Sequence, residues 1–415
     1  MGRGGSLFSS ESVTCGHPDK LCDAISDTIV DACLKIDPDA RVAVETLVKG
    51  MRDKSVIMLA GEVTISSNPP NYEQLARDAA SEIGYNNHKI GMDATSQQLC
   101  DVQVNITTQA ANIAQGVDRD GAGDQGIMFG FACKETERFS DLEGRYFPLA
   151  AALSQRVTRR LRIVRELPED DSSYLGWARP DGKSQVTVEY DANGTPSRVH
   201  TVIVAIQHDS NLKDRFDGDE VQEHAFIKSE IIEHVIRDAI PSELLDENTI
   251  FTVNGTGRFA DPAGPYADAG LTGRKVIVDT YGGMGRHGGG AFSGKDPSKV
   301  DRSAAYAARW AAKHVVAAGL ADRCEIQLAY VIGVAEPVSI RVETFDTSVI
   351  PEDEIAEKIK QVFDFTPRAI IVALDLLRPI YSSTASGGHF GRTPGVDGEF
   401  PWEVLDAQLI EALST

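Results

Sequence analysis

A strand-like phrase recurs along this chain and limits the folds that it can form. Each copy alternates apolar, often β-branched residues with polar ones and has an acid near its end, at residues 41–47, 185–190, 275–281 and 339–345. This period-two alternation predicts half-buried strands. The acids are 144, 90 and 64 residues apart, which excludes the short fixed period of a solenoid. Related domains that each contain such a strand would give irregular gaps, and chance resemblance among strands is the alternative.

Helical patterns lie between these strands. Residues 18–36 place apolar side chains on one face, with Pro18 in the first turn, where a missing N–H has no partner to lose. A second helix is predicted over 297–320, with Asp296 as its cap, Pro297 in its first turn and Gly319 near its end. Further helical candidates cover 72–84, 220–239 and 352–363. Strands mixed with helices, without a regular βαβ rhythm, predict an α+β fold of several layers.

Turn-rich segments at 115–126, 166–184 and 254–273 are the candidate boundaries. A chain of 415 residues is long enough for two or three domains. We predict an N-terminal domain at 1–115, a central domain at 121–260 and a C-terminal domain at 261–415. Segments can interleave between these structural domains.

The net charge narrows the choice of partners. The chain has 41 Lys and Arg against 62 Asp and Glu, for a net charge of −21. So acidic a chain is a poor general binder of nucleic acid or anionic membranes, and we expect neither partner. An anionic ligand must therefore meet a local basic patch set against the overall field.

Cysteine usage and the start of the chain favour a cytoplasmic protein. The six cysteines form no C-x-x-C pair and no metal-ligand spacing, which predicts reduced thiols. We find neither the roughly 18 apolar residues of a membrane span nor an apolar signal region in the first ten residues. Gly2 and Ser6 match the loose myristoylation pattern, which is short and common by chance.

Residues 273–302 concentrate glycine and positive charge. This window holds eight glycines, six Lys or Arg and three acids, so it is net positive inside an acidic protein. Glycine lets backbone N–H groups approach a ligand, and a following helix start adds its dipole. The window predicts a polyphosphate site, with a glycine-rich surface loop as the alternative. Residues 289–296 nearly match a P-loop, but Asp296 stands where that motif needs Ser or Thr. We therefore do not favour a P-loop NTPase.

A second group of candidate residues lies at 16–20, which read Gly-His-Pro-Asp-Lys at the start of the first helix. A His and an Asp two residues apart at a helix N-terminus can serve one ligand, the His toward a phosphate and the Asp toward a metal. Capping is the alternative for an Asp in a first turn. Phe259 can stack on a base or fill the core.

At these residues the sequence resembles the S-adenosylmethionine synthetase (methionine adenosyltransferase) family. The resemblance is carried by residues 16–20, 121–126, 270–275, 279–283 and 288–299, and it extends from about Phe8 to 388–392 and 400–402. It implies three related mixed α/β domains in a pseudo-threefold arrangement. It also implies a reaction in which the sulfur of L-methionine attacks C5′ of ATP. The displaced tripolyphosphate is then hydrolysed to pyrophosphate and phosphate.

The resemblance also implies roles for individual residues. The expected catalytic residues, which contact the triphosphate, are His17, Lys183, Arg274, Lys275, Lys295 and Lys299. His17 would donate to the departing oxygen. Asp181, Thr256, Arg258 and Phe259 would complete the ATP site. The expected methionine-binding residues are Glu62, Gln109, Asp124, Asp268 and Ile332. Asp19 and Asp301 would bind Mg²⁺, two ions per site, and Glu45 with Ser293 would bind K⁺. The family assembles as a dimer of dimers in which two subunits build each site.

Several positions depart from the family pattern. Cys15 stands where Glu is usual, Gly255 where Pro or Ser is usual, and Ala267 where Gly is usual. The family's mobile loop reads Gln-Ser-Pro-Asp-Ile, whereas this chain has Ala110, Ala111 and Asn112 between Gln109 and Ile113. Additional residues lie near 50–56 and 394–398. These changes raise the hypothesis of a paralogue that uses another thioether, with neutral drift as the alternative. A non-catalytic nucleotide-binding partner is a third hypothesis, against which the retained charged set argues.

Overall fold

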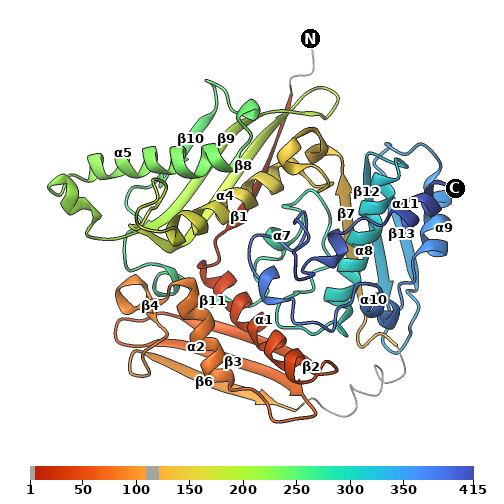
Figure 1. The fold of residues 1–415 in the computed structure, drawn as a ribbon, viewed down its shortest axis with the longest axis horizontal. Coiled ribbons are helices and arrows are strands. Elements are labelled where there is room, and N and C mark those ends of the chain that lie inside the picture. The colour runs from red at the N-terminus through yellow and green to blue at the C-terminus, as the bar shows by residue number, and fades with distance from the viewer. Residues whose placement is uncertain (1–4, 109–120) are drawn as a thin grey trace.

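The computed structural model of this chain describes residues 5–108 and 121–415. The described residues form units of sheet and helix that surround a common centre (Figure 1). This arrangement confirms the expected α+β fold. All six cysteines are free and buried. No helix in the described part of the chain has the length and apolar character that a membrane crossing requires.

The first unit is built on a sheet with the order β11-β2-β3-β6. Its strands are β11 (Gly270–Leu271), β2 (Arg41–Lys49), β3 (Ser55–Thr64) and β6 (Cys100–Thr107). Helices α1 (Pro18–Ile36) and α2 (Tyr72–Ile83) cover one face (Figure 1), as the apolar periodicity predicts. A small ribbon pairs β4 (Asn86–Asn87) with β5 (Met92–Asp93).

The second unit has the sheet order β1-β8-β9-β10. Its strands are β1 (Ser6–Val13), β8 (Ala178–Tyr190), β9 (Pro196–His208) and β10 (Ile250–Val253). Helix α4 (Leu149–Glu166) packs on this sheet. Helix α5 (Glu220–Ile231) continues through a π-helical stretch (Ile232–Ile236) into α6 (Arg237–Ala239). Apolar side chains of these elements form a core of their own.

The third unit has the sheet order β13-β12-β7, from β13 (Ser339–Glu343), β12 (Arg323–Tyr330) and β7 (Gly126–Cys133). Helix α8 (Val300–Ala317) packs on β7 and β12. The other helices are α9 (Glu352–Val362), α10 (Pro367–Ala373) and α11 (Ala407–Ser414). The core of this unit is continuous with that of the first one.

Each sheet takes strands from distant parts of the chain. The N-terminal strand β1 pairs with β8, β7 pairs with β12, and β11 pairs with β2. The segments therefore interleave between the sheets. The limits 1–115, 121–260 and 261–415 follow the order of the chain and stay a prediction.

Three of the four strand phrases are confirmed, and each lies in a different sheet: 41–47 in β2, 185–190 in β8 and 339–345 largely in β13. The strand predicted over 275–281 is wrong, because this segment forms the short helix α7 (Val276–Asp279) and a turn. The Asp279 N–H donates to the Lys275 carbonyl at 2.9 Å, and the Asp279 carboxylate is buried against Lys20 of α1. This long-range ion pair overrides the β propensity of the Val-Ile-Val run.

The helices predicted at 18–36, 72–84, 220–239 and 352–363 are confirmed. The helix predicted over 297–320 begins later, at Val300, with Lys299 as its cap residue. Asp296 is therefore not its cap. Its carboxylate accepts the Val42 N–H at 2.7 Å and the Ser298 N–H at 2.9 Å, so it joins β2 to a turn ahead of the helix. Gly319 follows the helix with a left-handed φ of 74°.

Candidate active site

The N-terminus of α1 gathers a compact group of charged side chains. Asp19 is buried, and its carboxylate accepts the Leu271 N–H at 3.0 Å and the Lys275 Nζ at 2.5 Å. Arg274 lies 3.7 Å from the same carboxylate. Burial opposes ionisation of Asp19, but the hydrogen bonds from Lys275 and Leu271 outweigh it and lower its pKa. The structure thus brings together four predicted residues: Asp19, Arg274, Lys275 and, beside Asp19, His17.

His17 is held in one tautomer. Its Nδ1 accepts the Asp19 N–H at 3.2 Å, which leaves the proton of the neutral ring on Nε2. Burial, together with the positive charges of Lys275 and Lys183, lowers the pKa of His17 to about 3. The ring is therefore neutral at pH 7 and presents an N–H donor at Nε2.

Glycine at position 16 lets this loop touch the second unit. A Cβ atom at Gly16 would lie 2.3 Å from the Cβ of Pro180, so no side chain fits there. The adjoining Thr14 hydroxyl donates to the Pro180 carbonyl at 2.6 Å. This contact brings β8, with Asp181 and the exposed Lys183, to the α1 N-terminus.

Asp181 has an unusual environment for a carboxylate. Burial raises its pKa to about 7, while Lys183 and the backbone N–H groups of Gly264 and Gly182 favour the charged form. The exposed Asp268 opposes that charge. Asp181 and Asp268 therefore lie near each other and beside Lys183.

A second cationic group lies ahead of α8. Lys295 Nζ is 2.6 Å from Asp301, and Lys299 Nζ is 2.5 Å from Asp296. A Cβ atom at Gly290 would lie 2.3 Å from the Asp301 carboxylate, so the glycine-rich loop passes directly over this acid. Both lysines are partly exposed and can reach a ligand.

A cavity of about 320 Å³ opens beside this second group. Its lining includes Glu45 of β2, Glu62 of β3, Ser293 and Lys295. The Ser293 hydroxyl is buried and has no hydrogen-bond partner. A carboxylate and an unpaired hydroxyl in one cavity are oxygen donors of the type that a hard cation takes, so the residues fit the expected K⁺.

The predicted adenine-side residues lie on the turn after β10. Arg258 is already engaged, because its guanidinium lies 2.7 Å from both the Glu223 carboxylate and the Ser210 carbonyl. The Phe259 carbonyl accepts the His208 N–H at 2.9 Å, and Thr256 is exposed. The bonds of Arg258 and Phe259 hold this turn to neighbouring segments, and Thr256 stays exposed.

Asp124 and Ile332 lie on neighbouring loops of the third unit. The Ala122 N–H donates to Val334 at 3.0 Å, and the Gly333 N–H donates to Ala122 at 2.8 Å. The side chains of Asp124 and Ile332 are exposed. Gln109, predicted for methionine, lies outside the described residues, as do Ala110, Ala111, Asn112 and Gly2.

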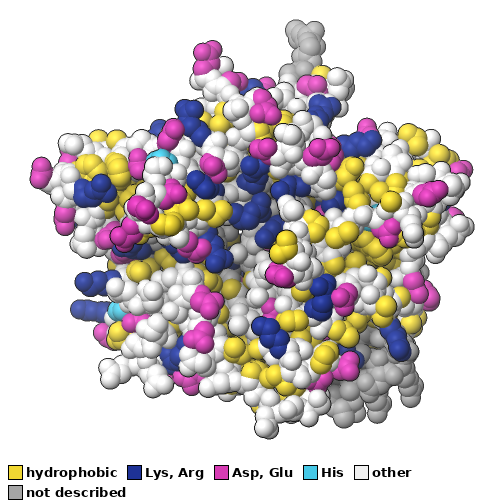
Figure 2. Space-filling model, viewed as in Figure 1, with side chains coloured by type: hydrophobic (Ala, Val, Ile, Leu, Met, Phe, Trp, Pro, Cys, Tyr) yellow, Lys and Arg dark blue, Asp and Glu magenta, His cyan; other side chains and the backbone are white. Residues whose placement is uncertain are grey.

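The predicted site therefore falls into separate groups on one chain. The first group is His17, Asp19, Lys183, Arg274 and Lys275, and the second is Lys295, Lys299 and Asp301. Figure 2 shows Lys and Arg side chains gathered near the middle of one face of this acidic protein. The described residues contain no cluster of three metal-ligating side chains. Single carboxylates such as Asp19 and Asp301 fit Mg²⁺, which keeps several waters and shares substrate phosphates.

Sequence reasoning missed a row of acids on α1. Asp19, Asp23, Asp27 and Asp31 are spaced four apart, on one face of the helix. Each accepts a backbone N–H from the C-terminal part of the chain: Leu271, Gly273, Gly294, and Tyr381 with Ser382. The regular four-residue spacing of these aspartates was the available signal. This row therefore holds two parts of the glycine-rich window 273–302, at Gly273 and Gly294, against α1.

Comparison with known families decides the identity. Models of the S-adenosylmethionine synthetase domains match residues 5–111 (N-terminal domain), 119–259 (central domain) and 263–404 (C-terminal domain). The chain belongs to the S-adenosylmethionine synthetase family. Its activity is that of a methionine adenosyltransferase, a transferase that makes S-adenosylmethionine. The resemblance noted in the sequence is confirmed.

Proposed function

We propose that the cationic group at the α1 N-terminus and the one ahead of α8 hold the triphosphate of ATP while methionine sulfur attacks C5′. One observation carries this proposal: eight predicted residues from four distant segments fall into just two charged groups, each built around an acid and a lysine. A thioether carries no proton, so the attack needs no general base. The catalytic task is to stabilise a departing polyanion, which preorganised cations do.

His17 has the geometry for the departing oxygen. Its neutral ring keeps a hydrogen on Nε2, and its orientation is fixed by the Asp19 N–H. We infer that Nε2–H donates to the oxygen that leaves C5′. Lys183, Arg274 and Lys275 then balance charge on the released triphosphate from the same side. Lys295 and Lys299 exchange their present carboxylate partners for phosphate oxygens.

The cations complete this charge balance. Bound Mg²⁺ would supply Lewis-acid stabilisation of phosphate oxygens, and K⁺ would supply fixed positive charge at the cavity beside Lys295. Asp19 and Asp301 would each hold one of the two Mg²⁺ ions. Glu45 and the unpaired Ser293 hydroxyl would hold K⁺.

Two subunits would build each site. We infer that the first group of one chain faces the second group of another, in a homo-oligomer that forms a dimer of dimers. Asp181, Thr256, Arg258 and Phe259 would then surround the nucleoside of ATP. Glu62, Gln109, Asp124, Asp268 and Ile332 would surround methionine.

A direct assay tests this function. The purified protein is incubated with ATP, methionine, Mg²⁺ and K⁺, and S-adenosylmethionine is measured by mass spectrometry together with phosphate and pyrophosphate. We expect the adduct with matched amounts of both phosphates. Ethionine in a parallel incubation checks the hypothesis of another thioether. Phosphate release without an adduct would contradict the proposal.

A further inference from the structure

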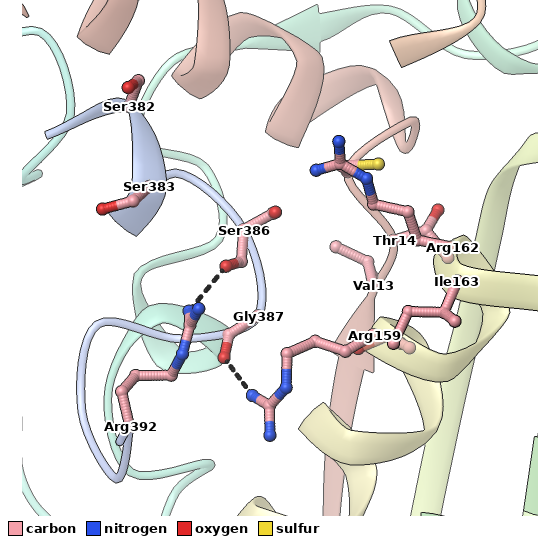
Figure 3. Close-up of a pocket in the computed structure, with 12 residues that line it drawn as sticks. Val13, Thr14, Arg159, Arg162, Ile163, Ser382, Ser383, Ser386, Gly387 and Arg392 are labelled. Atoms are coloured by element: carbon pink, nitrogen blue, oxygen red, sulfur yellow. Dashed lines mark hydrogen bonds between the residues drawn. The ribbon is translucent and has the colours of Figure 1, made fainter. Parts of the chain in front are cut away.

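A cavity of about 330 Å³ is lined by none of the residues of the proposed mechanism, although its wall includes Thr14 and Cys15, just ahead of His17 in the chain. It is lined by the end of β1, the middle of α4 and the loop that contains Ser382–Thr384 and Arg392 (Figure 3). Three guanidinium groups line it, from Arg159, Arg162 and Arg392. The described residues of its lining include no carboxylate. Such a lining is unusual in a chain with a net charge of −21.

Two of the three guanidinium groups have only neutral partners. Arg159 donates to the Gly387 carbonyl at 2.8 Å, and Arg392 donates to the Ser386 and Gly388 carbonyls at 3.0 Å each. In the parts of the chain that the structure covers, neither forms an ion pair. Arg162, at the rim, donates through Nε to Glu166 at 2.8 Å. Positive charge in the cavity thus exceeds the negative charge around it.

The neighbouring charges increase this imbalance. Burial lowers the pKa of Arg392 to about 10, with Arg145 adding to the effect and Glu403 opposing it. Burial also lowers the pKa of Arg159, and the charges of Arg392, Arg145 and Arg156 lower it further. The charge of Arg392 therefore acts against that of Arg159. A bound anion would relieve that repulsion.

The shape of the cavity selects the type of anion. Figure 3 shows Arg162 above the open space and Arg159 and Arg392 below it, where their guanidinium groups turn to the Gly387 and Ser386 carbonyls. The Ser386 hydroxyl points into the space. A tetrahedral anion presents oxygens in several directions and suits this arrangement better than a planar carboxylate. The guanidinium fork also matches phosphate geometry. The volume lies at the lower end of the range for small-molecule sites, roughly 300–1,000 Å³.

We propose that this cavity binds the phosphate group of a small molecule, held by Arg159, Arg162 and Arg392 and by the Ser386 hydroxyl. None of these residues belongs to the proposed catalytic groups, so this proposal does not depend on their roles. Its wall includes Cys15, at the position where the family usually has Glu. A carboxylate there would face Arg162 and Arg165, whose charges already act on the Cys15 thiol. Cysteine therefore leaves these cations available to a ligand.

Crystallography with selenate locates the site directly. Selenate has the charge and shape of sulfate, and its selenium gives an anomalous signal. We expect a selenium peak between Arg159 and Arg392 in crystals of the whole protein, and its loss in crystals of Arg159→Gln. Selenium peaks confined to the surroundings of Lys275 or Lys295 would overturn the proposal.

Calorimetry then identifies the source of the phosphate group. Inorganic phosphate, pyrophosphate and glycerol phosphate are titrated separately into the wild type and Arg162→Gln. Arg162 is about half exposed, with a side-chain accessibility of 47%, so this variant should fold. For one class of sites, we expect the dissociation constant to be at least about tenfold higher in the variant. The preferred titrant distinguishes a free anion from a phosphate ester.

Matched variants keep this test specific. Arg341→Gln removes a similarly exposed arginine, with a side-chain accessibility of 64%, and should bind as the wild type does. Cys15→Glu adds a carboxylate to the wall and should abolish the same class of sites, whereas Cys15→Ser should retain it. Unchanged binding in both Arg162→Gln and Cys15→Glu would overturn the proposal.

Discussion

The proposed role of Lys295 predicts a large effect on turnover and a small one on methionine binding. Its ammonium lies 2.6 Å from Asp301 and beside the cavity of Glu45. Because its charge would act on the leaving group, Lys295→Ala should lower kcat by about 10²- to 10³-fold. The dissociation constant for methionine should change by less than about threefold. Steady-state kinetics and equilibrium binding measure the two quantities.

The exposed Lys360→Ala is the control for Lys295→Ala and should change neither quantity. An equal loss of turnover and of methionine binding would contradict a role on the leaving group.

Asp19 gives a test for the proposed Mg²⁺ ligand. Its carboxylate has two cationic neighbours, Lys275 and Arg274, so it can exchange one of them for a metal ion. Asp19→Asn keeps the shape and removes the charge, so half-maximal activity should need several-fold more Mg²⁺. Asp101→Asn, at a half-buried carboxylate paired with Lys54, should leave the Mg²⁺ titration unchanged. An unaltered titration in Asp19→Asn would rule out the ligand assignment.

The sequence identifies individual site residues, but it does not identify the residues that they contact. The motif at 16–20 marks His17 and Asp19 in the sequence. The partner of Asp19 is Lys275, 256 residues away, and no local pattern encodes that pairing. The neutral state of His17 likewise depends on burial and on two lysines from distant segments. Long-range packing decides such properties.

Helix α1 is the element on which the site depends. Its row of aspartates accepts backbone N–H groups from Leu271, Gly273 and Gly294. A fully buried ion pair joins Asp27 to Arg302 of α8 at 2.7 Å. Asp27→Ala would leave a buried guanidinium without its partner and should lower the free energy of unfolding by about 3–5 kcal/mol. Denaturant unfolding measures the change.

A surface pair is the matched control for Asp27. Glu233 and Arg237 are four residues apart and mostly exposed. Glu233→Ala should change the free energy of unfolding by no more than about 0.5 kcal/mol. A similar small effect for Asp27→Ala would show that the α1–α8 ion pair does not secure the fold.

Elements were predictable where local pattern and packing agree. The amphipathic pattern of 18–36 and the alternation of 41–47 both match their surroundings. The predictions from local pattern are wrong at 275–281, where Asp279 forms an ion pair with Lys20. They are also wrong at Asp296, whose carboxylate accepts an N–H of β2 and does not cap the helix. In both places a buried carboxylate finds a partner far away in the chain. Local propensity has no information about that partner.

The stability of the whole molecule should respond to pH through Asp181. Its pKa of about 7 in the folded chain lies above the value near 4 of an unfolded aspartate. The folded state therefore holds a proton that the unfolded state releases. This stabilisation is fully present below about pH 4 and is lost as the pH rises to about 7.

Asp181→Asn should remove this dependence. The wild type should lose at most about 4 kcal/mol between pH 4 and pH 8 through this group, and the variant should lose correspondingly less. Denaturant midpoints across this range measure the difference. The exposed Asp170→Asn is the control. Parallel pH profiles for Asp181→Asn and the wild type would contradict the raised pKa.

The assembly of the molecule is tested by mixing two inactive variants. His17→Ala disables the first charged group, and Lys295→Ala disables the second. If each site takes one group from each of two subunits, a mixed dimer has one site with both defects and one site with none. After dissociation and reassociation of an equal mixture, about a quarter of the wild-type activity should return. Activity that stays at the level of the separate variants would place both groups of a site on one chain. Mixing His17→Ala with Lys275→Ala, whose defects fall in the same group, should restore nothing. Only a site shared between subunits makes the first pair recover while the second does not.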